Sequence, residues 1–293
     1  MVALRLAASS GTSQTYTVQF SDIAGFQDLG VLNLLINNVL DGRHACYVGY
    51  SNPENTVYLV NDSGDGLSQA LVLNGSGSIS NSQCTVNGAG SFASGVGNGL
   101  ALTLNMSFTP AFAGNKVVYI AARNIAEDNS GWNTMGAHNI PGAPVTFPRS
   151  SSVTPASGSA NNAVITFAYQ DGSNATNLQT SWALINTAID GRAACYVAYY
   201  QPGNRIYLIP DNGDGAQATS MMLTGTNSLS NSQCTVSSQG SSVAVSGNAL
   251  NVSLNITFNS AFAGPKGIWT ATQTLSGQTS AWQALGAWQV PSP

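Results

Sequence analysis

A cysteine-containing motif that occurs twice constrains the fold of this chain more than any other sequence feature. Residues 80–86 read SNSQCTV, and the same letters return at residues 230–236. Upstream, DGRHACYV at residues 41–48 returns as DGRAACYV at residues 190–197. Because the matches keep their order and nearly keep their spacing, the sequence predicts one module written twice by internal duplication.

Hydrophobic residues in each module alternate with a period of two. The longest example is LALTLNMSF at residues 100–108, which returns as LNVSLNITF at residues 250–258. This alternation is typical of strands with one buried face, and turn-forming residues separate about seven to nine short strands in each module. The sequence therefore predicts an all-β fold of two tandem immunoglobulin-like β-sandwiches, over residues 1–142 and 143–293.

Two short motifs carry a family resemblance. VTPASG opens the second module at residues 153–158, and a Phe-Ala-Gly corner at residues 112–114 and 262–264 precedes a strand-like segment. With these motifs the chain resembles, over essentially its full length, the tandem immunoglobulin-like or fibronectin-III-like modules of large secreted bacterial proteins. The resemblance implies a spacer, adhesive or assembly role without catalysis.

Few residues carry a charge. Only 7% are Asp, Glu, Lys or Arg, and eight basic against twelve acidic residues give a net charge of −4. Such a chain has no basic stripe that could neutralise phosphates, so we expect no nucleic-acid partner. No apolar run approaches the ~18 residues of a membrane-spanning helix, so we expect no transmembrane segment.

The four cysteines occupy equivalent positions in the two modules: Cys46 and Cys84 in the first, Cys195 and Cys234 in the second. None belongs to a CxxC or Cys/His cluster, which would indicate zinc or redox chemistry. The simplest interpretation is one disulfide per module, and the alternative is buried free thiols. Since structural disulfides persist in oxidising compartments, we expect an extracellular or cell-surface protein.

Acidic residues recur in a glycine-rich loop. NDSGDG returns as PDNGDG, which places Asp62 near Asp65 and Asp211 near Asp214. Carboxylates at this spacing, with backbone carbonyls, could hold Ca²⁺, so calcium is the one cofactor that the sequence suggests. The full spacing and the terminal Glu of an EF-hand are missing, and a plain Asp-Gly turn explains the residues equally well.

The only lysines of the chain, Lys116 and Lys266, are also equivalent. One hypothesis is an isopeptide bond of the kind found in bacterial immunoglobulin-like adhesins, to Asn37 and Asn186 or to Asp41 and Asp190. A lysine that protects a strand edge from pairing, or that pairs with an aspartate, is the commoner explanation.

Aromatic residues recur as well, and six of them are candidate ligand-binding residues: Tyr47, Tyr58 and Trp132 in the first module, and Tyr196, Tyr207 and Trp282 in the second. If they face outward, they would form a platform that stacks on sugar rings. If they face inward, they would belong to the core or to an interface. Cys46 and Tyr47 are neighbours on one strand and so point to opposite faces.

Catalytic motifs are missing. Neither His44 nor His138 has a counterpart in the other module, and no GxSxG, HExxH or P-loop motif occurs. We therefore expect no enzyme. The leading hypothesis is an extracellular structural or adhesive protein, a spacer or a subunit of a surface assembly or filament, which associates with itself or with other surface proteins. The alternative is a pair of carbohydrate-binding modules with polysaccharide as the partner.

Overall fold

The computed structural model describes residues 2–3 and 7–292, and it confirms the predicted all-β fold. Contacts divide the chain into a first unit that includes Ser9–Ala143 and a second unit that includes Pro144–Pro293. Each unit has one hydrophobic core, to which strands of two different sheets contribute. Both units are therefore β-sandwiches.

The strands of the first unit are β1 (Val2–Ala3), β2 (Ala7–Ser10), β3 (Ser13–Ser21), β4 (Leu29–Asn37), β5 (Cys46–Ser51), β6 (Thr56–Val60), β7 (Leu67–Val72), β8 (Ser78–Ser80), β9 (Cys84–Val96), β10 (Gly99–Phe108), β11 (Gly114–Asn124) and β12 (Asn133–Ile140). Those of the second unit are β13 (Arg149–Thr154), β14 (Ser157–Ser159), β15 (Asn162–Gln170), β16 (Leu178–Asn186), β17 (Cys195–Tyr200), β18 (Arg205–Leu208), β19 (Thr219–Met222), β20 (Ser228–Ser230), β21 (Cys234–Ser246), β22 (Ala249–Phe258), β23 (Gly264–Thr274) and β24 (Gln283–Val290).

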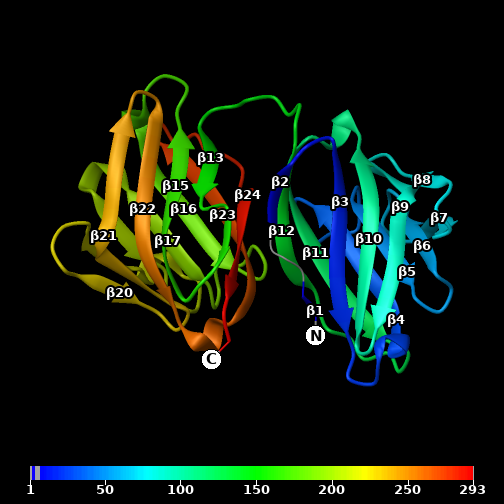
Figure 1. Cartoon of the computed structure of the whole chain (residues 1–293). Coiled ribbons are helices and arrows are strands. Elements are labelled where there is room, and N and C mark those ends of the chain that lie inside the picture. Colours follow the sequence, from blue (N-terminus) through cyan, green and yellow to red (C-terminus); the bar gives the residue numbers. More distant parts are fainter. Residues whose placement is uncertain (1, 4–6, 293) are drawn as a thin grey trace. The chain divides into compact units, whose positions relative to one another are not determined.

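The two units arrange their strands in the same order. In the first unit, a five-stranded sheet has the order β1-β3-β10-β9-β8, and a seven-stranded sheet has the order β2-β12-β11-β4-β5-β6-β7. The second unit repeats both orders, with β13-β15-β22-β21-β20 and β14-β24-β23-β16-β17-β18-β19. Figure 1 shows the sheets of each unit as two layers. The origin of the two units by duplication stays a prediction from the sequence.

The alternating segments supply the cores. On β10, Leu102, Leu104 and Met106 are at most 1% exposed, and they belong to the same core as Leu34 and Ile36 on β4 of the opposite sheet. Burying one such side chain contributes about 1.5–3 kcal/mol. The period of two in the sequence is thus the period with which side chains enter the space between the sheets.

A disulfide joins the two sheets of each unit, as the sequence predicts. Cys46 opens β5 of the seven-stranded sheet and is bonded to Cys84, which opens β9 of the five-stranded sheet. Cys195 and Cys234 make the equivalent bond between β17 and β21. Closing loops of 38 and 39 residues stabilises each unit by about 4 kcal/mol in the chain-entropy model.

The helical segments within the described residues are single 3-10 turns of three residues, such as η2 (Pro110–Phe112) and η6 (Ser260–Phe262). None of these segments has the length or the apolar character that a helix needs to cross a lipid bilayer.

Candidate binding site

The outer face of each seven-stranded sheet carries half-buried aromatic side chains. On β17, Cys195, Val197 and Tyr199 belong to the core. Tyr196 and Tyr200 alternate with them and therefore point to the opposite, outer face of the sheet, where both are half-buried. Side chains alternate in the same way on β5 of the first unit: Cys46, Val48 and Tyr50 are core residues, and Tyr47 points outward.

In the second unit these side chains line a hollow that we call the second-unit groove. Its lining residues are Thr180, Trp182, Tyr196, Ala198, Tyr200, Tyr207, Ile209, Gly215 and Ala218, and its volume is about 290 Å³. Ala198 on β17 lies directly opposite Trp182 on β16 and Tyr207 on β18. A small residue therefore forms the floor, and aromatic residues stand on both sides of it.

The first unit has a smaller hollow at the equivalent place, which we call the first-unit groove. Its lining residues are Val31, Asn33, Tyr47, Gly49, Ser51, Tyr58, Val60 and Leu67, and its volume is about 120 Å³. Gly49 takes the place of Ala198, and it lies opposite Asn33 on β4 and Tyr58 on β6. Both units thus hold a groove on the same three strands.

A tryptophan packs against one wall of each groove. Trp132 directly precedes β12 and meets Tyr47 edge-to-face, with ring centroids 5.8 Å apart. Trp282 directly precedes β24 and meets Tyr196 in the same way at 6.0 Å. The structure therefore brings the six predicted aromatic residues together in two sets of three. All six are half-buried, which places them at the surface and outside the cores.

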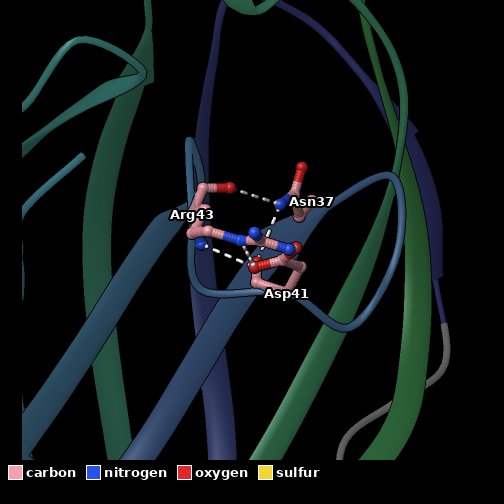
Figure 2. Close-up of polar contacts among 3 residues, drawn as sticks. All are labelled: Asn37, Asp41 and Arg43. Carbon is pink, nitrogen blue, oxygen red and sulfur yellow. Dashed lines mark hydrogen bonds and ion pairs between the residues drawn. The ribbon is translucent and has the colours of Figure 1, made fainter. Parts of the chain in front are cut away.

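A tight, charged turn, whose polar contacts Figure 2 shows, lies next to Tyr47 of the first-unit groove. Asn37 Nδ2 donates hydrogen bonds to the carbonyl oxygens of Asp41 and Arg43, at 2.8 and 3.1 Å. Arg43 Nη2 lies 2.6 Å from Asp41 Oδ2. A Cβ on Gly42 would lie only 3.4 Å from Tyr47 Cδ1, so the backbone of the turn covers the edge of that ring. Asn186, Asp190 and Arg192 repeat the arrangement beside Tyr196.

The ion pairs in these turns are exposed. The side chains of Arg43 and Arg192 are 72% and 75% exposed. Hydrogen bonds from the arginine side chain lower the pKa of Asp41 and of Asp190 to about 2. Each arginine is therefore matched by a carboxylate that stays ionised, and the turn places no unpaired charge beside the groove.

The aspartates considered for calcium make hydrogen bonds to other protein groups, Asp62 and Asp211 to a neighbouring loop and Asp65 and Asp214 within their own loops. The carboxylate of Asp62 accepts hydrogen bonds from the backbone N–H and the hydroxyl of Ser82, and Asp211 does the same with Ser232. Asp65 accepts a hydrogen bond from Asn61, while Asp214 caps η5 (Gly215–Gln217). Within residues 2–3 and 7–292, no three His, Cys, Asp or Glu side chains gather into a group that could hold a metal ion. Calcium binding stays a prediction.

The two lysines are buried at equivalent places. Lys116 Nζ lies 4.3 Å from the centre of the Phe112 ring and donates a 2.8 Å hydrogen bond to Asn38 Oδ1. Lys266 Nζ lies 4.5 Å from the Phe262 ring centre and donates to the Ala263 carbonyl. Burial lowers the pKa of both amines to about 8. The lysines therefore lie within the sandwiches and do not guard a strand edge. Asn37 and Asp41, which we considered as isopeptide acceptors, are held in the charged turn.

His138 has a structural environment. Its side chain is 0% exposed, with Nδ1 2.7 Å from Ser9 Oγ and Nε2 2.9 Å from the Gly11 carbonyl oxygen. Both ring nitrogens therefore have a hydrogen-bond partner in the segment that contains Ser9 and Gly11. Burial lowers the pKa of His138. The histidine thus fastens β2 to β12.

Two aromatic residues of the second-unit groove were not among the site residues predicted from the sequence. Trp182 and Tyr200 line the groove, but Asn33 and Ser51 take their places in the first unit. A search for aromatic residues shared by the two modules cannot find them. The alternation of side chains along a strand could have revealed Tyr200: it lies four residues after Tyr196 on the same strand and therefore points to the same face.

No protein-family model and no curated protein matches this chain. A function for the grooves is therefore inferred from the residues that line them.

Proposed function

We propose that the protein is a non-catalytic extracellular adhesive protein that binds polysaccharide through the aromatic grooves on its outer sheet faces. The observation that carries the proposal is the second-unit groove, in which Trp182, Tyr196, Tyr200 and Tyr207 surround Ala198. Binding sites for small ligands are concave and largely apolar, with a few polar groups that fix orientation. This proposal keeps the adhesive role of the leading sequence hypothesis and gives it the partner of the alternative.

Sugar rings suit such a groove for a physical reason. The faces of tyrosine and tryptophan rings carry partial negative charge, whereas the C–H groups on the flat faces of a pyranose carry partial positive charge. Tyrosine hydroxyls can then exchange hydrogen bonds with the sugar hydroxyls. No Asp, Glu, Lys, Arg or His lines either groove, which favours an uncharged ligand.

The extracellular location rests on the disulfides. The Cys46–Cys84 and Cys195–Cys234 bonds lie in the cores, and disulfides of this structural kind persist in oxidising compartments. The non-catalytic role rests on the sequence, in which no GxSxG, HExxH or P-loop motif occurs. The contacts of His138 and of the repeated aspartates Asp62 and Asp211 support it, because these side chains make hydrogen bonds that hold segments of the fold together.

The test is retention of the purified chain on insoluble neutral polysaccharides: cellulose, chitin, xylan and mannan. We expect retention on at least one of them, and we expect the double variant Tyr58→Ala/Tyr207→Ala to lose it, because one wall of each groove disappears. Phe92→Ala is the matched control: this aromatic side chain is 53% exposed on β9 of the five-stranded sheet, and its loss should leave retention unchanged.

Thermal unfolding of each variant shows whether it is folded. A folded double variant that is retained as well as the parent chain would rule out the grooves as the binding site. The absence of retention on all four polysaccharides would contradict the proposed function itself.

A further inference from the structure

We infer that the two grooves are unequal, and that the second-unit groove alone forms a four-walled seat for one pyranose unit of a neutral polysaccharide. This inference rests on the proposed function and adds the location and the chemical class of the main site. It depends on three comparisons between the grooves: their walls, their hydroxyl groups and their charges.

The walls of the second-unit groove surround the floor on four sides. Trp182 and Tyr207 flank Ala198 across the strands, and Tyr196 and Tyr200 precede and follow it by two positions along β17. Neighbouring strands are about 4.8 Å apart, and residues on a strand rise about 3.4 Å each. The backbone positions of facing walls are therefore about 10 Å apart across the strands and about 14 Å apart along β17, which leaves room for a single hexose ring between the aromatic side chains.

The first-unit groove lacks two of these walls. Asn33 stands where the second unit has Trp182, and Ser51 stands where it has Tyr200. The volume falls accordingly from about 290 to about 120 Å³. Ligand pockets usually have volumes of ~300–1,000 Å³, so the second-unit groove comes close to that range and the first-unit groove lies well below it.

The hydroxyl groups differ in the same direction. In the first unit, Tyr47 donates a 3.2 Å hydrogen bond to Asn33 Oδ1, and Tyr58 donates a 2.6 Å hydrogen bond to Glu54 Oε2. In the second unit, the hydroxyls of Tyr196, Tyr200 and Tyr207 make no hydrogen bond within the described part of the chain. In the first groove the O–H donors of both tyrosines are already used by protein side chains, whereas in the second groove three tyrosine hydroxyls can both donate to a ligand and accept from it.

No charged side chain lines the second-unit groove, which favours a neutral sugar there. Glu54 binds the hydroxyl of a groove residue in the first unit, and Gly203 replaces this glutamate in the second unit. Arg205 on β18 lies opposite Tyr200 on β17 but does not line the second-unit groove. Its Nη2 donates a 3.0 Å hydrogen bond to Ser220 Oγ. The seat itself therefore offers rings, hydroxyls and small residues.

Isothermal titration calorimetry of the full chain tests the inference. The probes are neutral hexasaccharides of glucose, xylose, mannose or N-acetylglucosamine, and an acidic oligogalacturonate. We expect one site per chain for a neutral probe. Trp182→Asn and Tyr200→Ser, which install the first-unit residues, should each weaken binding about tenfold or more, because a stacking wall is lost. Phe92→Ala, on the five-stranded sheet away from both grooves, should change affinity by less than about twofold.

The reverse substitutions provide a second measurement that does not depend on loss of binding. Asn33→Trp/Ser51→Tyr should raise the stoichiometry from one site to two. Two equal sites in the parent chain, or undiminished binding by a folded Trp182→Asn variant, would overturn the inequality while leaving the proposed function intact. Binding of oligogalacturonate alone would overturn the neutral class. Failure of every saccharide to bind would contradict the proposed function, and the inference with it.

Discussion

Asn81 shows at the level of one residue why the most strongly repeated motif is structural. Its Nδ2 donates hydrogen bonds to the carbonyl oxygens of Ala45 and Val60, and its Oδ1 accepts hydrogen bonds from the N–H groups of Gln83 and Cys84. The side chain therefore connects the two sheets beside the disulfide, and Asn231 makes the same four bonds. The sequence revealed the repetition, but partners 21 and 36 residues away become visible only in the fold.

We predict that Asn81→Ala lowers the free energy of unfolding of the first unit by about 3 kcal/mol, because buried backbone groups lose their partners. Asn231→Ala should do the same to the second unit. Hydrogen exchange at increasing urea concentrations, measured peptide by peptide, reports each unit separately. Asn98→Ala is the control, since Asn98 is exposed in a turn and should cost no more than about 0.5 kcal/mol. Equal effects of Asn81→Ala and Asn98→Ala would contradict this role.

At the level of elements, the strands that face the core were predictable and the exposed ones were not. The alternation at residues 100–108 matches β10, whereas β9 was missed. β9 has the sequence CTVNGAGSFASGV, and most of its second half is exposed. It is a strand because its backbone pairs with β10. The pairing continues past an irregularity, at which Gly90 has a φ of 81° and Ser91 Oγ accepts a hydrogen bond from Asn105 N–H. Pairing of this kind leaves no hydrophobic pattern in the sequence.

The attachment of β2 provides a pH-dependent prediction. His138 is neutral when Nε2 donates to the Gly11 carbonyl and Nδ1 accepts from Ser9, and burial lowers its pKa from 6.5. The unfolded chain therefore takes up a proton first as the pH falls, so this contribution to stability is complete above pH 6.5 and is lost below it. We expect the first unit to be less stable at pH 5 than at pH 7, as measured by hydrogen exchange at each pH.

The second unit and one variant serve as controls for that experiment. Trp288 replaces His138 there and donates a 2.9 Å hydrogen bond from Nε1 to the Ala160 carbonyl oxygen, a contact that does not titrate. The second unit should therefore keep its stability between pH 7 and pH 5. His138→Gln retains a donor but cannot take up a proton, so it should remove the pH dependence of the first unit. A loss of equal size in both units would show that another group is responsible.

At the level of the whole molecule, the two units share a strand order and differ in what they present on it. The sequence predicted the two β-sandwiches and the disulfides, and it singled out six recurring aromatic residues without deciding whether they face outward or inward. It could not predict the difference between the grooves, because Trp182 and Tyr200 become wall residues only when β16, β17 and β18 are in register. A function that resides in one copy of a repeated fold is invisible to a search for what the copies share.

The most direct test of the saccharide-binding account is a nuclear magnetic resonance titration that follows the indole N–H signals of the five tryptophans. A neutral hexasaccharide that binds in the calorimetric test is added to the ¹⁵N-labelled chain, with signals assigned by single Trp→Phe variants. The account predicts that the Trp182 signal shifts most, that Trp282 follows through its contact with Tyr196, and that Trp269 and Trp288, which are 1% and 4% exposed, stay in place. A saturable shift at Trp269 or Trp288 while Trp182 stays still would contradict it.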